Sequence, residues 1–279
     1  MQTRKLILAL SIMGLAGTAQ AATWTLGATT VGGLRIGAVS FDGLPAGVEI
    51  GNLTDDLDDI TPAYVAAGSW RSFSASLGGN TLDVGLSHEA HVETVVGGDP
   101  AKAAARVLTS AVLENASIGS AVTLSAVALA PASLRQDFIL TPELGESAGM
   151  PVFVTYQGYY SHDAVLSAGL TGFINSSAVL YLNGVQIDSA VASGVGTGTG
   201  YPQTFNARIG DTLTVELLNT TQVGAANLLL NAGAMPEALA LGEVGVELTV
   251  SPIPEPETYA LMLAGLGLVG WMAQRRRSA

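Results

Sequence analysis

Hydrophobic and polar residues alternate with a period of two through much of residues 22–250. In "NTLDVGLS", the side chains of Leu82, Val84 and Leu86 would share one face of an extended strand, because successive side chains of a strand point to opposite faces. The stretches "PVFVTYQGYY", "TLTVELLN" and "GEVGVELTV" alternate in the same way. The pattern predicts a series of half-buried β-strands.

Glycine- and asparagine-containing turns separate these stretches. Asn183-Gly184 lies between "AVLYL" and "VQIDS", and Asn-Gly is the strongest short hairpin signal. Gly210-Asp211 separates "TFNARI" from "TLTVELL". Many short strands with such turns are typical of an antiparallel β-sandwich or jelly roll, so we predict an all-β fold.

One segment favours another structure. Asp99-Pro100 opens "DPAKAAARVLTSAVLEN", and Asp at the N-cap followed by Pro at the first helical position is a helix-start signal. The stretch "RVLTSAVL" also fits a strand, but the capping residues lead us to predict a short helix.

Further along, the turn-rich residues 141–150 would divide residues 22–250 if these form two sandwich halves rather than one domain.

Composition narrows the function classes. The chain has 279 residues, no cysteine and a formal net charge of -12. It therefore has neither disulfides nor cysteine-based zinc sites. An acidic surface repels nucleic acid, so we expect no nucleic-acid partner.

The first residues, "MQTRKLILALSIMGLAGTAQA", predict a signal peptide over residues 1–21. A basic start precedes an apolar run at residues 6–16, which is too short to span a bilayer, and Ala19 and Ala21 form a small-x-small cleavage site. We expect signal peptidase to cut after Ala21 and the mature chain to be exported.

The last residues predict a single short transmembrane helix. Residues 259–273 carry no charge; as a helix they would span about 22 Å at ~1.5 Å per residue, against about 30 Å for a hydrocarbon core. Arg275, Arg276 and Arg277 follow, and the positive-inside rule places them in the cytoplasm. Residues 22–250 would then lie outside.

Ahead of that helix, the linker 251–257 contains Pro254-Glu255-Pro256, an extended segment with few backbone hydrogen bonds that an enzyme can grip. This linker resembles the PEP-CTERM sorting signal when it is taken together with the signal peptide and with the helix and arginines of residues 258–279. The resemblance implies that a membrane-embedded exosortase recognises the tripeptide, while the helix stops in the inner membrane and Arg275–Arg277 retain the tail. It further implies a Gram-negative, exopolysaccharide-producing source and a final location at the cell surface or in the matrix.

The chain offers few chemical motifs. Asp55, Asp56, Asp58 and Asp59 would supply oxygen ligands to calcium or form a solvated acidic turn; no other cofactor is expected. On a strand His88 and His91 would point to opposite faces, and we interpret them as surface histidines rather than a zinc site.

Two further groups suggest minor functions. His162-Asp163 would need a spatially adjacent serine for hydrolysis, and there is no Gly-x-Ser-x-Gly elbow. Tyr156 and Tyr160 would share one strand face, with Tyr159 on the other, and such rings stack on sugars or fill the core. We therefore predict a non-enzymatic exported surface or matrix protein, with carbohydrate or calcium binding as the alternative and a secreted hydrolase as a third hypothesis.

Overall fold

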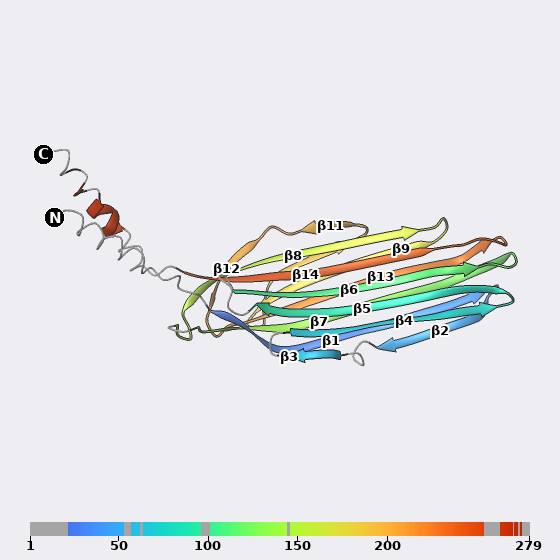
Figure 1. The fold of residues 1–279 in the computed structure, drawn as a ribbon, viewed down its shortest axis with the longest axis horizontal. Helices are drawn as coiled ribbons and strands as arrows, with labels where there is room; N and C mark the ends of the chain where they lie inside the picture. Colours follow the sequence, from blue (N-terminus) through green and yellow to red (C-terminus); the bar gives the residue numbers. More distant parts are fainter. Residues whose placement is uncertain are drawn as a thin grey trace, which may run out of the picture.

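The computed structural model describes residues 22–52, 57–61, 64–95, 101–143, 146–253, 263–269, 271–272 and 274, without the side chains of residues 52, 57–61, 64–67, 95 and 252. Two antiparallel sheets of long strands pack face to face as a β-sandwich (Figure 1). The predicted all-β sandwich is thus confirmed.

The six-stranded sheet has the strand order β10-β9-β13-β7-β1-β2. Its strands are β1 (Thr23–Phe41), β2 (Leu44–Asn52), β7 (Val122–Thr141), β9 (Thr171–Leu182), β10 (Val185–Ser193) and β13 (Thr212–Leu230).

The eight-stranded sheet has the order β11-β8-β14-β6-β5-β4-β3, and β12 also pairs with β8. Its strands are β3 (Leu57–Thr61), β4 (Tyr64–Leu77), β5 (Asn80–Val95), β6 (Ala101–Ser117), β8 (Pro151–Leu166), β11 (Gly196–Thr199), β12 (Gln203–Arg208) and β14 (Ala238–Pro252).

Alternation explains how these strands build the core. Buried and half-buried residues alternate along nearly all of β7, as expected for a strand with one face on a core.

Residues 141–150 connect β7 to β8 and so lead from one sheet to the other. Strands from both sides of this connection pair directly, β7 with β13 and β6 with β14.

The predicted helix after Asp99-Pro100 is wrong for the described residues, because residues 101–117 form strand β6. β6 lies between β5 and β14 in the interior of its sheet and pairs with both. Ala101, Ala103 and Ala105 alternate into the core, where small side chains suit the close approach of the opposite sheet. Pairing on both edges and burial therefore override the capping signal.

The Asn183-Gly184 turn is confirmed as a tight hairpin. Leu182 pairs with Val185 across it, and both turn residues have positive φ, 50° and 80°, as a type I′ turn requires. Gly210-Asp211 also forms a turn, but it joins β12 to β13, which belong to different sheets.

We expect Gly184→Ala to lower the free energy of unfolding by about 1 kcal/mol, because an L-residue is strained at positive φ. Gly200→Ala is the matched control, since Gly200 has no positive φ and its added Cβ would meet its nearest atom at 3.5 Å. Urea unfolding measures both. An equal loss in the two variants would contradict this account of the turn.

A polar belt divides the core into two apolar clusters. On the eight-stranded sheet it consists of His88, Thr109 and His162, which share one cross-strand rung with Gly242; on the six-stranded sheet it consists of Ser176, Asn219 and Thr221. All of these polar side chains are buried. One cluster, around Trp24, Phe138 and Leu217, lies on one side of the belt, and the other, around Phe41, Leu124 and Val223, lies on the other side.

Near the C-terminus, residues 263–269 are helical. Within the described part of the chain, no helix has the length and apolar character needed to cross a membrane.

Candidate functional site

Strand β8 positions the tyrosines singled out in the sequence. Its alternating side chains place Tyr156 and Tyr160 beside the groove between the sheets, and Tyr159 on the outer surface of the eight-stranded sheet, directly opposite Gly245 of β14. The expected division of these three tyrosines between two faces is therefore confirmed.

On the outer surface, the Tyr159 ring lies over Gly245. A Cβ added to Gly245 would overlap the ring, so only glycine allows the aromatic side chain to lie down on β14. The Tyr159 hydroxyl donates a hydrogen bond to Glu243 Oε1 at 3.4 Å. Burial, and secondarily the charge of Glu243, raises the pKa of Tyr159 to about 12, so its hydroxyl remains a neutral donor at physiological pH.

Charged side chains surround this ring. Arg106 lies opposite Gly245 on the next strand, and its Nη1 is 3.8 Å from Glu243 Oε1. His91 lies opposite Arg106 on β5; burial, followed by the charge of Arg106, lowers the pKa of His91. The ring is thus bordered by hydrogen-bond acceptors and donors on a surface that is on balance acidic.

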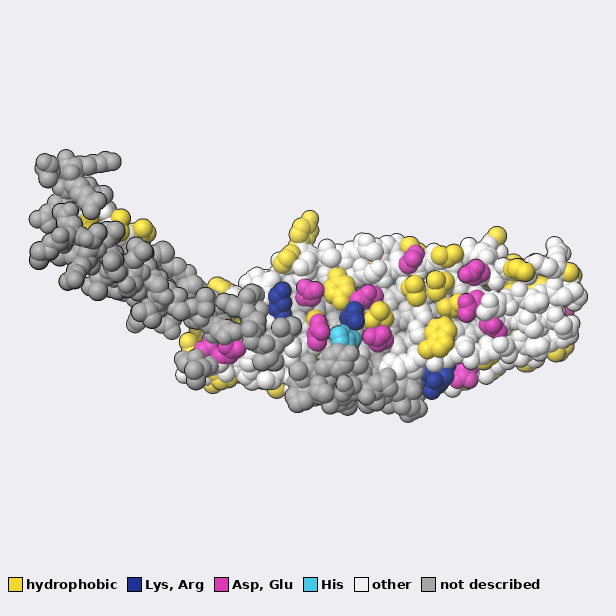
Figure 2. Space-filling model, in the orientation of Figure 1, with side chains coloured by type: hydrophobic (Ala, Val, Ile, Leu, Met, Phe, Trp, Pro, Cys, Tyr) yellow, Lys and Arg dark blue, Asp and Glu magenta, His cyan; other side chains and the backbone are white. Residues whose placement is uncertain are grey.

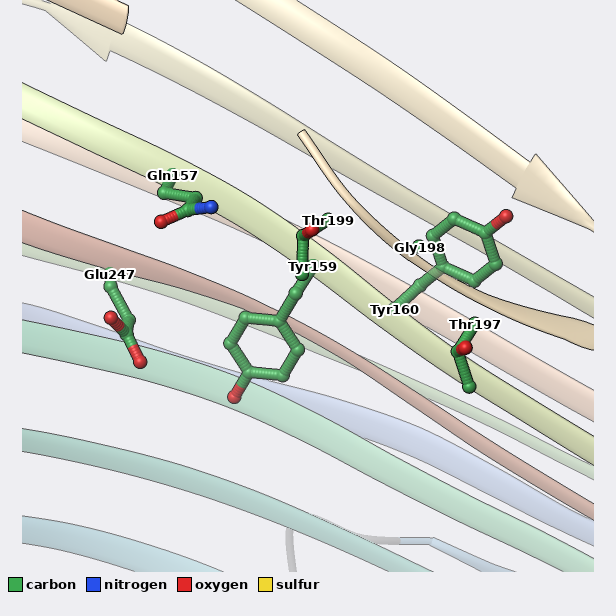
Figure 3. A pocket seen from close by; sticks show the side chains of 7 residues that line it. All are labelled: Gln157, Tyr159, Tyr160, Thr197, Gly198, Thr199 and Glu247. Carbon is green, nitrogen blue, oxygen red and sulfur yellow. The ribbon is translucent and has the colours of Figure 1, made fainter. Parts of the chain in front are cut away.

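An open hollow of about 540 Å³ lies beside Tyr159 (Figure 3). Its lining consists of Gln157, Tyr159, Tyr160, Thr197, Gly198, Thr199 and Glu247. In Figure 3 the rings of Tyr159 and Tyr160 leave β8 in different directions. The hollow therefore combines aromatic surface with hydroxyl, amide and carboxylate groups, which are the groups that recognise polyhydroxylated ligands.

A second space, of about 490 Å³, lies between the sheets at the edge formed by β8, β9, β10 and β11. The Tyr156 hydroxyl donates a hydrogen bond across it to Asp188, and burial, reinforced by that bond, raises the pKa of Tyr156. The Tyr160 ring lies against Gly198, whose added Cβ would be 2.5 Å from Tyr160 Cε1. The Tyr160 ring thus packs against the edge strand β11.

The polar belt ties the sheets together deeper in this groove. His162 Nε2 lies 2.5 Å from Ser176 Oγ, and its Nδ1 lies 2.8 Å from the carbonyl oxygen of Gly194. Ser176 donates to Asn219 Oδ1 at 2.9 Å, and Asn219 donates to the Val107 carbonyl oxygen at 3.4 Å. The serine needed by the hydrolase hypothesis is thus beside His162, but Asp163 follows His162 on the strand and projects to the opposite face.

The interpretation of His88 and His91 as a pair of surface histidines is wrong for His88. β5 does place His88 and His91 on opposite faces, as expected for a strand. However, His88 is 2% exposed and its Nε2 lies 3.0 Å from Ser69 Oγ, so it is not a surface residue. The inner face of β5 is covered by the second sheet. The alternation of Leu82, Val84 and Leu86 extends to His88, two residues further along the strand, and could have placed it on this buried face.

Most sequence-predicted site residues lie outside the described residues. These are Ala19 and Ala21 of the signal cleavage site, Asp55 and Asp56 of the acidic cluster, Pro254, Glu255 and Pro256 of the sorting tripeptide, and Arg275, Arg276 and Arg277. Asp58 and Asp59 belong to β3, but only their backbone is described. Among the residues that are described, no group of three or more His, Asp or Glu side chains is placed to hold a metal ion.

The glycines that lie beneath the aromatic rings were not predicted from the sequence to be part of the site. A glycine inside an alternating strand signals close approach of another group, and "GEVGVELTV" contains such a glycine at Gly245. The residue that approaches it, Tyr159, lies 86 positions earlier in the sequence. Only the pairing of β14 with β8 connects the two residues.

Comparison with known proteins decides the nature of the C-terminal segment. Residues 252–277 match the model of the PEP-CTERM protein-sorting motif. The chain therefore carries a PEP-CTERM protein-sorting motif. The match begins at the last residue of β14, and it implies export and membrane-associated sorting by an exosortase.

The solved structures compared with the sandwich ahead of this motif are distant from it in sequence. No curated protein matches the chain. The carbohydrate-binding module TmCBM61, solved in complex with β-1,4-galactotriose, is 11% identical over 66% of this chain and 88% of its own, with a TM-score of 0.20. A structure of infectious bursal disease virus Gx strain is 12% identical over 88% of this chain and 69% of its own, with a TM-score of 0.14. Both TM-scores are too low to assign a ligand.

Proposed function

We propose that this PEP-CTERM protein is a non-enzymatic component of the cell surface or extracellular matrix, which an exosortase processes at Pro254-Glu255-Pro256. The supporting observation is where the sandwich begins and ends: β1 starts at Thr23 and β14 ends at Pro252. Signal peptidase cutting after Ala21 and an exosortase acting at the tripeptide would both leave every strand intact. The product of both cuts is the complete sandwich.

The tail has a transient role in this proposal. Residues 258–279 hold an intermediate in the inner membrane, with Arg275–Arg277 retained in the cytoplasm of a Gram-negative cell. β14 lies between β6 and β8 in the interior of its sheet, so the strand next to the signal is anchored on both edges. The folded domain therefore resists being pulled apart while the enzyme grips the extended segment beyond it.

Deletion of the host's exosortase tests this proposal. In the deletion strain we expect the chain to accumulate in the membrane fraction with its C-terminal peptide still present by mass spectrometry, whereas the parent strain releases a shortened form. A chain ending at Pro252 is the control and should be released from both strains. Identical processing in parent and deletion strains would overturn the proposal.

The absence of catalysis is part of the proposal and is supported by the polar belt. Ser176 and His162 are each 2% exposed, and Ser176 also bonds Asn219, so the pair acts as a bond between the sheets. Calcium binding by Asp55, Asp56, Asp58 and Asp59 stays a prediction, which calorimetric titration of the purified protein with calcium tests.

A second function, carbohydrate binding, is favoured by one observation. The Tyr159 ring lies over Gly245 on the outer surface, next to Glu243 and the hollow lined by Gln157 and Glu247. Sugar rings stack on aromatic faces while their hydroxyls bond to adjacent polar groups. We propose the matrix polysaccharide as the partner of this surface.

A further inference from the structure

We propose that the outer face of the eight-stranded sheet binds a single chain of neutral polysaccharide, which runs obliquely across the strands and stacks on both Tyr159 and Trp70. The inference rests on the proposed carbohydrate-binding function. It adds the chemical class of the ligand and its path over the sheet.

Trp70 repeats the arrangement of Tyr159. It lies on β4 opposite Ser87 of β5, and a Cβ added to Gly85 would be 2.5 Å from Trp70 Cη2. The indole is therefore laid over β5 above a glycine, yet Trp70 remains 49% exposed. An aromatic ring over a glycine also shields the strand backbone, but a tryptophan used only for this purpose would not need to present half of its surface to solvent.

The cross-strand register places both rings on the same face. Tyr159, Gly245, Arg106 and His91 form one rung across β8, β14, β6 and β5. Ser87, opposite Trp70, is four positions from His91 on the same strand, and positions an even number apart share a face. Trp70 is thus four strands and four residues away from Tyr159, about 19 Å across the strands and about 13 Å along them.

The surface between the rings carries hydrogen-bonding groups. The intermediate rung contains Glu243 of β14, Leu108 of β6 and Glu89 of β5, and Ser87 and Ser110 are joined by a hydroxyl hydrogen bond of 2.5 Å nearer Trp70. Carboxylates and hydroxyls accept hydrogen bonds from sugar hydroxyl groups. A chain lying between the rings would therefore meet polar partners along its path.

Charge decides the class of polysaccharide. Acidic side chains are spread over this face among isolated hydrophobic ones (Figure 2), and the whole chain carries a net charge of -12. An acidic polysaccharide would be repelled by this surface, whereas a neutral one would use the carboxylates as acceptors. The face is therefore complementary to neutral sugars.

Affinity gel electrophoresis of the full chain in detergent tests the inference, with neutral glucan, galactan and mannan and with acidic alginate in the gels. We expect at least one neutral polymer to retard the protein and alginate to have no effect. Tyr159→Ala and Trp70→Ala should each weaken the binding roughly tenfold, as expected for the loss of one stacking ring, whereas Tyr159→Phe should keep most of it.

The matched control is Phe173→Ala, which removes an aromatic side chain that is also 49% exposed but lies on β9 of the other sheet. Its binding should equal that of the wild type, and melting temperatures verify that each variant is folded. Gly245→Ala gives an independent check, because it should weaken binding by displacing the Tyr159 ring without removing it.

The outcomes separate the inference from the function on which it rests. If Tyr159→Ala weakens binding but Trp70→Ala does not, the path across the sheet is wrong and carbohydrate binding at Tyr159 stands. If neither variant changes binding of a neutral polymer, the outer face is not the site. Binding of alginate alone would overturn the ligand class, and binding of no polymer would overturn the carbohydrate function itself.

Discussion

Replacing Pro254, Glu255 and Pro256 together by alanine is expected to abolish release and leave the full-length chain in the inner membrane. The residues lie within the matched sorting motif at 252–277. Proline disfavours helix and sheet hydrogen bonding, so the two prolines are expected to favour an extended segment. Three alanines would instead permit the predicted transmembrane helix to extend through it. Cell fractionation with an antibody against the sandwich measures the distribution, and mass spectrometry identifies the C-terminus.

Two controls make the result specific to the tripeptide. Changing Arg275, Arg276 and Arg277 together to lysine keeps the positive charge that we propose retains the tail, so processing should continue. The melting temperature of the alanine variant should match that of the wild type, since the strands end at Pro252. Normal release of the shortened protein from the alanine variant would show that the tripeptide is not the recognition element.

Asn219→Ala is expected to lower the free energy of unfolding by roughly 2–4 kcal/mol, the largest loss of stability that we predict. Asn219 is 0% exposed, and it accepts a hydrogen bond from Ser176 and donates one to the Val107 carbonyl oxygen on the other sheet. Alanine would leave the carbonyl oxygen without this donor and open a cavity between the sheets.

Urea unfolding of the purified protein measures this change. Asn206→Ala is the matched control, because Asn206 is an exposed residue on β12, and it should alter the free energy by less than about 0.5 kcal/mol. If Asn219→Ala were as mild as the control, the polar belt would not contribute to holding the two sheets together.

Local patterns predicted those features whose physical cause is local. Period-two alternation indicated strands because each strand has one face on the core, and Asn183-Gly184 indicated a hairpin because both residues tolerate positive φ. The split of Tyr156 and Tyr160 from Tyr159 followed from alternation alone. The helix predicted from the capping signal at Asp99-Pro100 was wrong because that signal reflects only the conformational preference of the isolated segment. In the folded protein, β6 pairs with a neighbouring strand on each edge.

The sequence by itself determined the all-β class, the hairpin turn and the sorting motif, because each depends on neighbouring residues or on a short linear segment. Only the tertiary structure brought His162 to Ser176, and only strand pairing laid Tyr159 over Gly245 and Trp70 over Gly85. The physical reason is the antiparallel register, which brings residues far apart in the chain into contact and assigns each side chain to the core or to the outer surface.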